Sequence, residues 1–331
     1  MTDPTYDVVA VGNAIVDVIA EVEDSFLVEH GLTKDSMELV EPDRAEALYA
    51  AMPPGIEASG GSAANTTVGV AAMGGRAAFI GKVRDDQLGA VYVHDLRASG
   101  VDFSVVPAAE GPPTASSLIV VTPDAHRTMN TSLGVAGQVG IEDIDVELVG
   151  GAKVVYCEGY LWDHDSMKDA LQLVMRVARE AGNKIALALS DGFCVDRHRD
   201  AFLDVIRSSV DMLFANEAEI CSLYEVAHFD DALQLAQKDC DLSFLTRGAA
   251  GAVVARRDEV HVVGAHPQGP VVDTTGAGDQ FAAGALFGLT HGHDIATCAR
   301  LGSLAAGEVI SHIGPRPHAD LQALAKTVLS R

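Results

Sequence analysis

One short stretch of the chain carries residue types that together could move a phosphoryl group. Within residues 270–284, the glycine-rich turn Gly276-Ala277-Gly278 is followed at once by Asp279. Apolar residues then recur at helical spacing, so the turn opens a helix whose first N–H groups lack partners and can bind an anion. A carboxylate in an anion site repels the anion, but it is useful if it takes a proton from a hydroxyl that attacks a bound phosphoryl group. We therefore predict a general base at Asp279; the alternative is an acidic residue that only caps a helix.

The string from Asp273 to Asp279 resembles a signature of the ribokinase-like (PfkB) family of ATP-dependent carbohydrate and nucleoside kinases. Another signature of that family is a Gly-Gly pair followed by an asparagine, which Gly60, Gly61 and Asn65 match. Both signatures occur in the family's order, and the resemblance extends over essentially the whole chain. It implies that Asp279 is the catalytic base. It also implies that the amides of Gly276, Ala277 and Gly278 neutralise charge on the transferred phosphate.

The acceptor end of the site is predicted from the first strand and its following turn. Asp17 lies just after a buried strand, at the edge where open α/β sheets bind ligands, and a carboxylate there can accept two hydroxyl hydrogen bonds. The resemblance implies that Asp17 binds the sugar, with Asn13, Gly60, Gly61 and Asn65 beside it. The alternatives are a solvated aspartate and a glycine-rich helix start.

Two further segments are candidates for the nucleotide and its metal. Asn216 and Glu219 match the family's Asn-x-x-Glu motif, which implies that they order magnesium-bound water; an exposed acidic helix start is the alternative. The segment 246–251 matches the family's Thr-x-Gly-x-x-Gly motif, so ATP contacts are implied there; a tight hairpin entry is the alternative. The ATP-binding residues expected are Asn216, Thr246, Arg247, Gly248 and Gly251.

A monovalent cation is the third group that the resemblance implies. In relatives, oxygens at the positions of Asp273 and Thr275, with a later loop at about residues 310–316, hold such an ion. That later loop departs from the commonest family version here, so the sequence leaves a requirement for K⁺ open. The expected cofactors are therefore ATP and Mg²⁺, with K⁺ as a further candidate.

The elements that must position these residues alternate between strand and helix. Strands are predicted at Tyr6–Gly12, Ala77–Gly81, Lys153–Cys157, Lys184–Leu189, Met212–Ala215 and Leu242–Thr246. Helices are predicted after Ser62 as N-cap and at Gln87–Ser99, Ser166–Ala181, Arg197–Ser208, Ala218–Val226 and Asp230–Asp239. Hairpins are predicted from Ala115–Thr122 with Arg127–Thr131, and from Ala252–Arg256 with Glu259–Val263. This alternation indicates helices on both faces of a mainly parallel sheet.

The predicted fold class is α/β: a ribokinase-like three-layer fold with a mainly parallel central sheet and a small β-sheet lid. We expect one kinase domain over residues 1–331. Two segments, at about 13–58 and 100–131, do not fit plain strand–helix alternation. By resemblance they form the lid over the substrate; an extended edge of the main sheet is the alternative.

Composition excludes several classes of function. The 47 acidic and 23 basic residues give a net charge of −24, which opposes binding to nucleic acid or to an anionic membrane. The five cysteines are scattered, and together with the acidic N-terminus this predicts a cytoplasmic protein without a disulfide framework. Residues 75–82 resemble a phosphate-binding Walker loop, but the glycine spacing is wrong and Val83 replaces its Ser/Thr. The twelve histidines show no metal-ligand spacing.

These residues predict an ATP-dependent kinase that phosphorylates a hydroxymethyl group of a small molecule. Segments 26–37 and 210–217 resemble adenosine kinases, so a nucleoside, adenosine first, is the expected acceptor, and a sugar such as ribose or fructose is the alternative. Apolar side chains at Ile15, Val16, Phe26, Leu27, Leu32, Met37 and Leu39 are candidate walls for a nucleobase. A non-catalytic sensor and a hydrolase are the alternatives of other classes. The protein is expected to act as a monomer or homodimer.

Overall fold

The computed structural model describes residues 4–34, 36–124 and 126–330, and its centre is an eight-stranded sheet, sheet A. Its strands, in spatial order, are β13 (Glu259–Val263), β12 (Ala252–Arg256), β11 (Leu242–Thr246), β10 (Met212–Asn216), β9 (Lys184–Ala188), β8 (Ala152–Glu158), β1 (Tyr6–Val11) and β5 (Ala77–Ile80). The six strands from β11 to β5 are parallel, and β12 and β13 are antiparallel. The mainly parallel sheet predicted from the alternation is confirmed.

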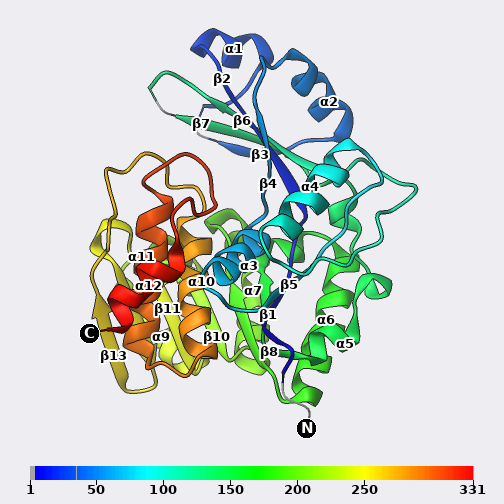
Figure 1. Cartoon of the computed structure of the whole chain (residues 1–331). Helices are drawn as coiled ribbons and strands as arrows, with labels where there is room; N and C mark the ends of the chain where they lie inside the picture. Colours follow the sequence, from blue (N-terminus) through cyan, green and yellow to red (C-terminus); the bar gives the residue numbers. More distant parts are fainter. Residues whose placement is uncertain (1–3, 35, 125, 331) are drawn as a thin grey trace.

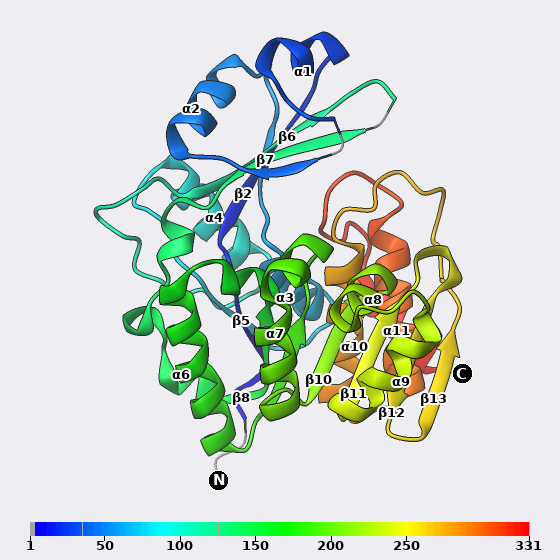
Figure 2. The same cartoon turned by 180° about the vertical axis from the view of Figure 1, so that it is seen from behind.

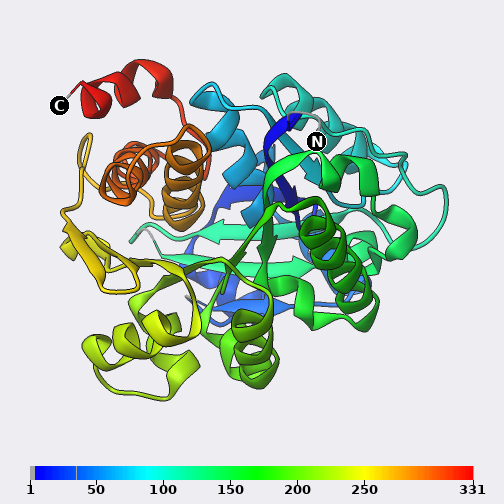
Figure 3. The same cartoon turned by 90° about the horizontal axis from the view of Figure 1, so that it is seen from below.

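Helices cover both faces of sheet A, which makes three layers (Figures 1 and 2). One face carries α3 (Ser62–Ala72), α4 (Gln87–Ala98), α10 (Ala277–Thr290) and α11 (Ile295–Val309), with α12 (Leu321–Leu329) outside them. The other carries α5 (Val146–Gly150), α6 (Asp165–Ala181), α7 (Gly192–Ser208), α8 (Glu217–Tyr224) and α9 (Phe229–Asp239). Strand β1 illustrates why both faces are covered, because its side chains alternate between two cores. Val8 and Ala10 are buried on the face of α3 and α10, whereas Val9 and Val11 are buried on the face of α6 and α7. Seen from below, orange α10 and α11 lie across the sheet from yellow-green α8 and α9 (Figure 3).

A second, five-stranded sheet, sheet B, lies beyond the end of sheet A at which β1 ends (Figure 1). Its strands are, in order, β3 (Met37–Leu39), β7 (Arg127–Ser132), β6 (Ala115–Val121), β2 (Ile15–Glu21) and β4 (Ile56–Ser59). Helices α1 (Asp24–His30) and α2 (Pro42–Ala51) pack on it, with Leu27 of α1 buried against Val22 and Val120. The segments that departed from strand–helix alternation thus build a separate small sheet. Residue 125, in the predicted turn between β6 and β7, lies outside the described residues.

Three local expectations need correction or restriction. Ser62 is the first residue of α3 and not its N-cap, because Gly61, with φ of 90°, precedes the helix and the Ser62 hydroxyl bonds elsewhere. Helix α7 begins at Gly192, five residues before its predicted start, and it is kinked at His198, where φ is −123°. The expectation drawn from the acidic N-terminus falls partly on residues 1–3, which are not described.

The packing of α3 against α10 brings the two distant signatures together. Gly69 of α3 lies so close to Gln280 and Ala283 that a β-carbon there would be 2.3 Å from the Gln280 side chain. Gln280 also donates to the carbonyls of Asn65 and Pro315, so one buried amide ties both signatures to the loop after α11. Among the helices of the described ranges, none is both long enough and apolar enough to span a membrane.

Candidate active site

The predicted anion site lies at the N-terminus of α10. Gly276 precedes the helix with φ of 76°, a left-handed conformation that favours glycine, and Pro315 leaves no room there for a side chain. By contrast, a β-carbon at Gly278 would meet nothing within 4 Å, so the backbone there faces open space. The first turn of α10 therefore presents unpaired N–H groups and the positive end of a helix dipole to a ligand.

Asp279 lies in the first turn of α10 and contacts two residues of the Gly60–Asn65 signature. The Ser62 hydroxyl donates to its Oδ1 at 2.6 Å, and the Asn65 amide donates to its Oδ2 at 3.1 Å. Burial raises the pKa of Asp279 above its usual value, and these two hydrogen bonds partly oppose the rise. A carboxylate that is fixed in place and has a raised pKa suits a general base.

Asp17 faces the glycine pair from β2, the strand that leads into sheet B. It is 8% exposed, and among the described residues its carboxylate has no hydrogen bond or ion pair. A β-carbon at Gly60 would lie 2.2 Å from Asp17 Oδ2, so the glycine is required by this close approach. Burial raises the pKa of Asp17 to about 7; the Asp279 charge adds to the rise, and Arg316 and Arg127 oppose it. A buried carboxylate without a protein partner fits a ligand that donates hydroxyl hydrogen bonds.

Asn13 is held beside Asp17 by a residue that the sequence analysis missed, Glu158 at the end of β8. The Glu158 carboxylate accepts from the backbone N–H and side-chain amide of Asn13 and from the N–H of Ala63. Burial raises its pKa to about 7. The Oδ1 atom of Asn13 is buried and has no partner among the described residues, so it is available to a ligand. A carboxylate after a parallel strand was the available signal for Glu158.

Asn216 and Glu219 form a reciprocal cap at the start of α8. Asn216 Oδ1 accepts from the N–H of Glu219, and the Glu219 carboxylate accepts from the N–H and amide of Asn216. This is the helix-start arrangement named as the alternative, yet Glu219 is buried and its pKa rises to about 7, mainly through burial and partly through the charges of Asp191 and Asp279. A buried carboxylate within electrostatic reach of Asp279 also fits Mg²⁺ held through water.

A cavity of about 540 Å³ opens beside the first turn of α10. The predicted ATP residues Thr246, Gly248 and Gly251 line it, and so do Ala277 and Gly278 of the anion site. Most of its wall is apolar and comes from residues that the sequence analysis missed, including Pro267, Val271, Phe281, Ala306 and Ile310. A largely apolar cavity of this size next to an anion site suits the base and ribose of a nucleotide.

Arg247 points away from this cavity's anion site. Its guanidinium donates to both carboxylate oxygens of Glu217, at 2.9 and 3.1 Å, and lies 4.1 Å from the ring centroid of Phe229. Both partners belong to the α8–α9 side of the sheet. Its contacts therefore favour a role in joining α8 to α9 over the predicted contact with phosphate.

Two other arginines do reach the site, and neither was predicted. Arg316, from the loop after α11, donates to Ser59 Oγ at 2.5 Å and to Asn65 Oδ1 at 3.4 Å. Arg127, from β7 of sheet B, donates to Thr275 Oγ1 at 2.5 Å and pairs with Asp273 Oδ2 at 2.6 Å. In a chain with 23 basic residues, an arginine inside a predicted ligand loop was the only sequence signal for Arg316; nothing marked Arg127.

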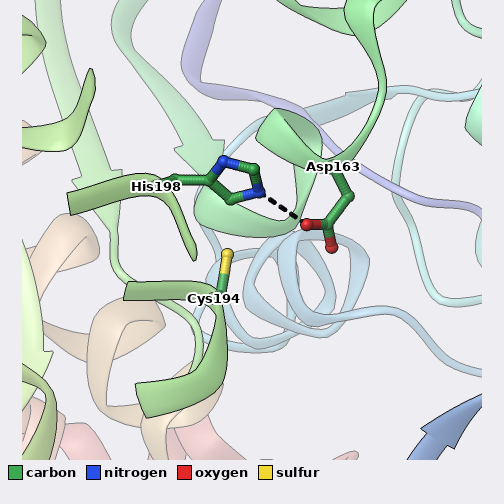
Figure 4. Close-up of side chains that lie close together, drawn as sticks. All are labelled: Asp163, Cys194 and His198. Carbon is green, nitrogen blue, oxygen red and sulfur yellow. Dashed lines mark hydrogen bonds and ion pairs between the residues drawn. The ribbon is translucent and has the colours of Figure 1, made fainter. Parts of the chain in front are cut away.

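A separate cluster joins Asp163, Cys194 and His198, whose ligand atoms lie within 4.8 Å of one another (Figure 4). Cys194 and His198 are four residues apart in α7, a spacing that the sequence analysis overlooked. The carboxylate already accepts from Arg197 at 3.0 Å, and it lies 2.7 Å from His198 Nε2. Burial raises the pKa of the Cys194 thiol, which disfavours the thiolate that a metal needs. These contacts favour a structural role in which Asp163 attaches its turn to α7.

A helix N-terminus with a fixed carboxylate, an adjacent nucleotide-sized cavity and a second, unpaired buried carboxylate together suit a phosphotransferase with an alcohol acceptor. The pfkB family carbohydrate kinases match this chain over residues 50–321, and the chain belongs to that family. The fold class and the family resemblance are confirmed.

Individual relatives are similar over most of the chain. An adenosine kinase from Sinorhizobium meliloti is 52% identical, with a TM-score of 0.92, and the match covers 97% of this chain and 99% of that one. A probable sugar kinase from Rhizobium etli is 48% identical, with a TM-score of 0.93, over 98% of each chain. An ATP-dependent ribose-1-phosphate kinase from Halopiger xanaduensis is 32% identical over 232 residues, 69% of this chain and 72% of that protein.

Proposed function

We propose that this protein transfers the γ-phosphate of ATP to the hydroxymethyl group of a ribonucleoside, with adenosine as the first candidate. The observation that carries the proposal is the pairing of two carboxylates with opposite surroundings. Asp279 is fixed by Ser62 and Asn65, as a base must be, whereas Asp17 is buried and without a protein partner, as a substrate anchor must be.

In this mechanism, the acceptor's neighbouring hydroxyls donate to Asp17 and to the free Oδ1 of Asn13. Its hydroxymethyl group then meets Asp279, which accepts the proton as the oxygen attacks the γ-phosphorus. The bond from the γ-phosphorus to the β,γ-bridging oxygen breaks in the same step, and ADP leaves. The N–H groups at residues 276–278 stabilise the negative charge on the transferred phosphoryl group. Positioning and electrostatics supply most of the acceleration, because phosphoryl transfer has a loose transition state.

Mg²⁺ would be held through water by the Asn216–Glu219 pair, and when bound it neutralises phosphate charge. The ATP base and ribose would occupy the 540 Å³ cavity beside Gly278. Phe281 supplies an apolar surface there, and Thr246 and Gly251 line the cavity between the end of β11 and the start of β12. Arg247 has no part in this mechanism.

The choice of adenosine rests chiefly on the 52% identity to an adenosine kinase. The apolar walls suggested by the sequence give it less support. Of those residues, Val16 and Leu27 are buried in hydrophobic cores, and Phe26 and Leu32 pack against them. Of the seven, only Ile15, Met37 and Leu39 neither belong to these cores nor pack against them, so the nucleobase slot would be narrower than the sequence indicated.

A sugar acceptor is the second candidate, because the 48% identical relative is a probable sugar kinase. One coupled ADP-release assay with Mg²⁺ tests both candidates, using adenosine, ribose, fructose and ribose 1-phosphate as acceptors. We expect kcat/KM for adenosine to exceed that for each other acceptor at least tenfold. A tenfold preference for a sugar would replace the nucleoside assignment. Binding of an acceptor without any ADP release would favour a non-catalytic sensor, and ADP release without phosphorylated acceptor would favour a hydrolase.

A further inference from the structure

The loop before the anion site contains a buried carboxylate that needs a cationic partner. Asp273 is 4% exposed and lies three residues before Gly276. Its Oδ1 accepts from the N–H of Thr275 at 2.9 Å, and its Oδ2 accepts from the N–H of Gly314 at 2.8 Å. Asp273 therefore joins the anion-site loop to the loop after α11. Two neutral N–H groups do not cancel its charge, and a buried charge without a counter-ion is strongly destabilising.

Arg127 provides the counter-ion from a different sheet. One terminal nitrogen of its guanidinium lies 2.6 Å from Asp273 Oδ2, and the other donates to Thr275 Oγ1 at 2.5 Å. Its side chain is 18% exposed, so the pair is sheltered from solvent. The planar, two-pronged guanidinium suits two oxygens held side by side. Arg127 is the first residue of β7, so this contact links sheet B to the anion-site loop.

These contacts do not fit the monovalent cation that family resemblance implies. Such an ion requires free oxygens at Asp273, Thr275 and the loop near residue 310. Both Asp273 oxygens accept from nitrogen donors, and Thr275 Oγ1 accepts from Arg127. The carbonyl of Ile310 also accepts from the N–H groups of Val272 and Asp273, at 2.8 and 3.3 Å. The Asp273 carboxylate, the Thr275 hydroxyl and the Ile310 carbonyl are thus already engaged.

We propose that the Arg127 guanidinium takes the place of the monovalent cation, so that turnover in this protein does not depend on K⁺. The inference rests on the proposed kinase function and deepens it, because it concerns how the anion site is held. Arg127 acts here as a positioning residue, through Asp273 and the loop that ends at Gly276. One consequence is that the positive charge beside Asp273 belongs to a residue of sheet B, so the anion-site loop is linked to that sheet. A bound ion would make no such link.

The first experiment measures ADP release with Mg²⁺ and the best acceptor at constant ionic strength, in either potassium or tetramethylammonium chloride. We expect the wild-type rates in the two salts to agree within twofold. In Arg127→Met, the rate in tetramethylammonium should fall at least tenfold, and 100 mM K⁺ or a few millimolar guanidinium should restore at least fivefold. Arg127→Lys, which keeps the charge but cannot reach both oxygens as a fork, should retain more activity than Arg127→Met in tetramethylammonium.

A second readout does not depend on turnover. Crystals of wild type and of Arg127→Met are soaked in Rb⁺, and anomalous scattering is measured beside Asp273. We expect a Rb⁺ peak in the variant only, together with a K⁺-dependent rise in its melting temperature that the wild type lacks. Arg44→Met is the matched control: Arg44 also belongs to the sheet B region, but within the described ranges it donates to the carbonyl of His30 alone, so its loss should change none of these results.

Three outcomes would overturn the inference: activation of the wild type fivefold or more by K⁺, a Rb⁺ peak beside Asp273 in the wild type, or a loss in Arg127→Met that neither K⁺ nor guanidinium relieves. Failure of the kinase assignment looks different, because then no acceptor gives ADP in any salt. In that case the Rb⁺ and melting measurements still decide whether Arg127 holds the cation position.

Discussion

The two ends of the candidate site differ in how completely the protein satisfies its own polar groups. At the phosphate end, Asp279 accepts from Ser62 and Asn65, Asp273 pairs with Arg127, and Glu219 accepts from Asn216. At the acceptor end, Asp17 has no partner among the described residues, and Asn13 Oδ1 is buried and unpaired. The phosphate end is organised before a ligand arrives, whereas the acceptor end leaves its hydrogen-bonding capacity to the ligand.

This difference follows from the task proposed for each end, which is phosphoryl transfer at one and acceptor recognition at the other. Stabilising a transferring phosphoryl group requires donors and charges that do not have to reorganise during the reaction. Recognising an acceptor requires groups whose hydrogen bonds are completed only by the correct ligand, so that a wrong one leaves them unpaired. The unliganded protein is therefore less stable, because it carries the buried carboxylate of Asp17 without a hydrogen-bond partner among the described residues.

The largest loss of activity should come from replacing Asp279, the proposed general base of the phosphate end. We expect Asp279→Asn to lower kcat by about 10²–10⁴-fold, because the amide has the same shape but cannot accept the acceptor's proton. The KM for ATP should change little, and steady-state kinetics with circular dichroism would establish both points. A variant that kept a tenth or more of wild-type kcat would remove Asp279 from the role of base.

Ser62→Ala is a useful companion to that variant. It removes the 2.6 Å hydrogen bond to Asp279 Oδ1 and leaves the carboxylate in place. Because this hydrogen bond opposes the rise in the pKa of Asp279, its loss should move the acidic limb of the kcat profile to higher pH. A pH–rate profile unchanged from the wild type would indicate that the limb belongs to another group.

At the unsatisfied end, we expect Asp17→Asn to raise the acceptor KM at least tenfold and to leave the KM for ATP nearly unchanged. Hydrogen bonds to a charged group contribute about 1.5–3 kcal/mol each, and the ligand should make its own with Asp17. Initial rates with each substrate varied in turn measure both constants. Equal losses for both substrates would move Asp17 out of the acceptor site.

The same substitution should stabilise the unliganded protein at alkaline pH. The pKa of Asp17 is raised to about 7, so between about pH 4 and 7 the folded protein binds more protons than the unfolded chain and loses stability as the pH rises. At pH 8, Asp17→Asn should therefore be more stable than wild type by about 1–4 kcal/mol, at 1.4 kcal/mol per pKa unit. Urea unfolding at pH 8 and pH 4.5 tests this. A difference that does not narrow at pH 4.5 would show that the gain has another source.

Residues of the candidate site were predictable from the sequence where they lie close together along the chain, and much less so where they come from distant elements. The candidate residues of the phosphate end lie in short contiguous segments. Residue type and spacing were therefore enough to select Gly276–Asp279 and Asn216–Glu219 as candidates. Groups from distant elements were harder to predict: Glu158 holds Asn13, Arg316 contacts Ser59, and Arg127 pairs with Asp273, and the signals for them in the sequence were weak or missing. Most strand and helix positions were predictable from hydrophobic periodicity. The short strands β3 and β4, however, depend on pairing with their neighbours in sheet B, and helices α1 and α2 depend on packing against that sheet.

Glu158 tests how far the acceptor end depends on such distant support. In Glu158→Gln, one oxygen can still accept from Asn13, but the new NH₂ group meets the N–H of Ala63, where an acceptor is needed. Such an unsatisfied donor costs about 1–3 kcal/mol, so we expect kcat/KM for the acceptor to fall about five- to 150-fold, with ATP binding kept. Isothermal titration with acceptor and with an ATP analogue separates the two. Loss of both affinities would mean that Glu158 supports the fold and not the acceptor end.

The smallest effect should come from Arg247, although it belongs to a motif that the sequence analysis assigned to ATP. Its guanidinium pairs with Glu217 and lies over Phe229, so its charge is already committed to the junction of α8 and α9. An ion pair this open to solvent contributes little to stability. We expect Arg247→Met to change kcat and the KM for ATP less than threefold, with a melting temperature lowered by a few degrees at most. Glu217→Gln should give the same small loss of stability if the pair is structural. If Arg247→Met instead raised the KM for ATP tenfold while Glu217→Gln did not, the guanidinium would have to turn towards the phosphates when ATP binds, and the phosphate end would be less completely organised in advance than its hydrogen bonds indicate.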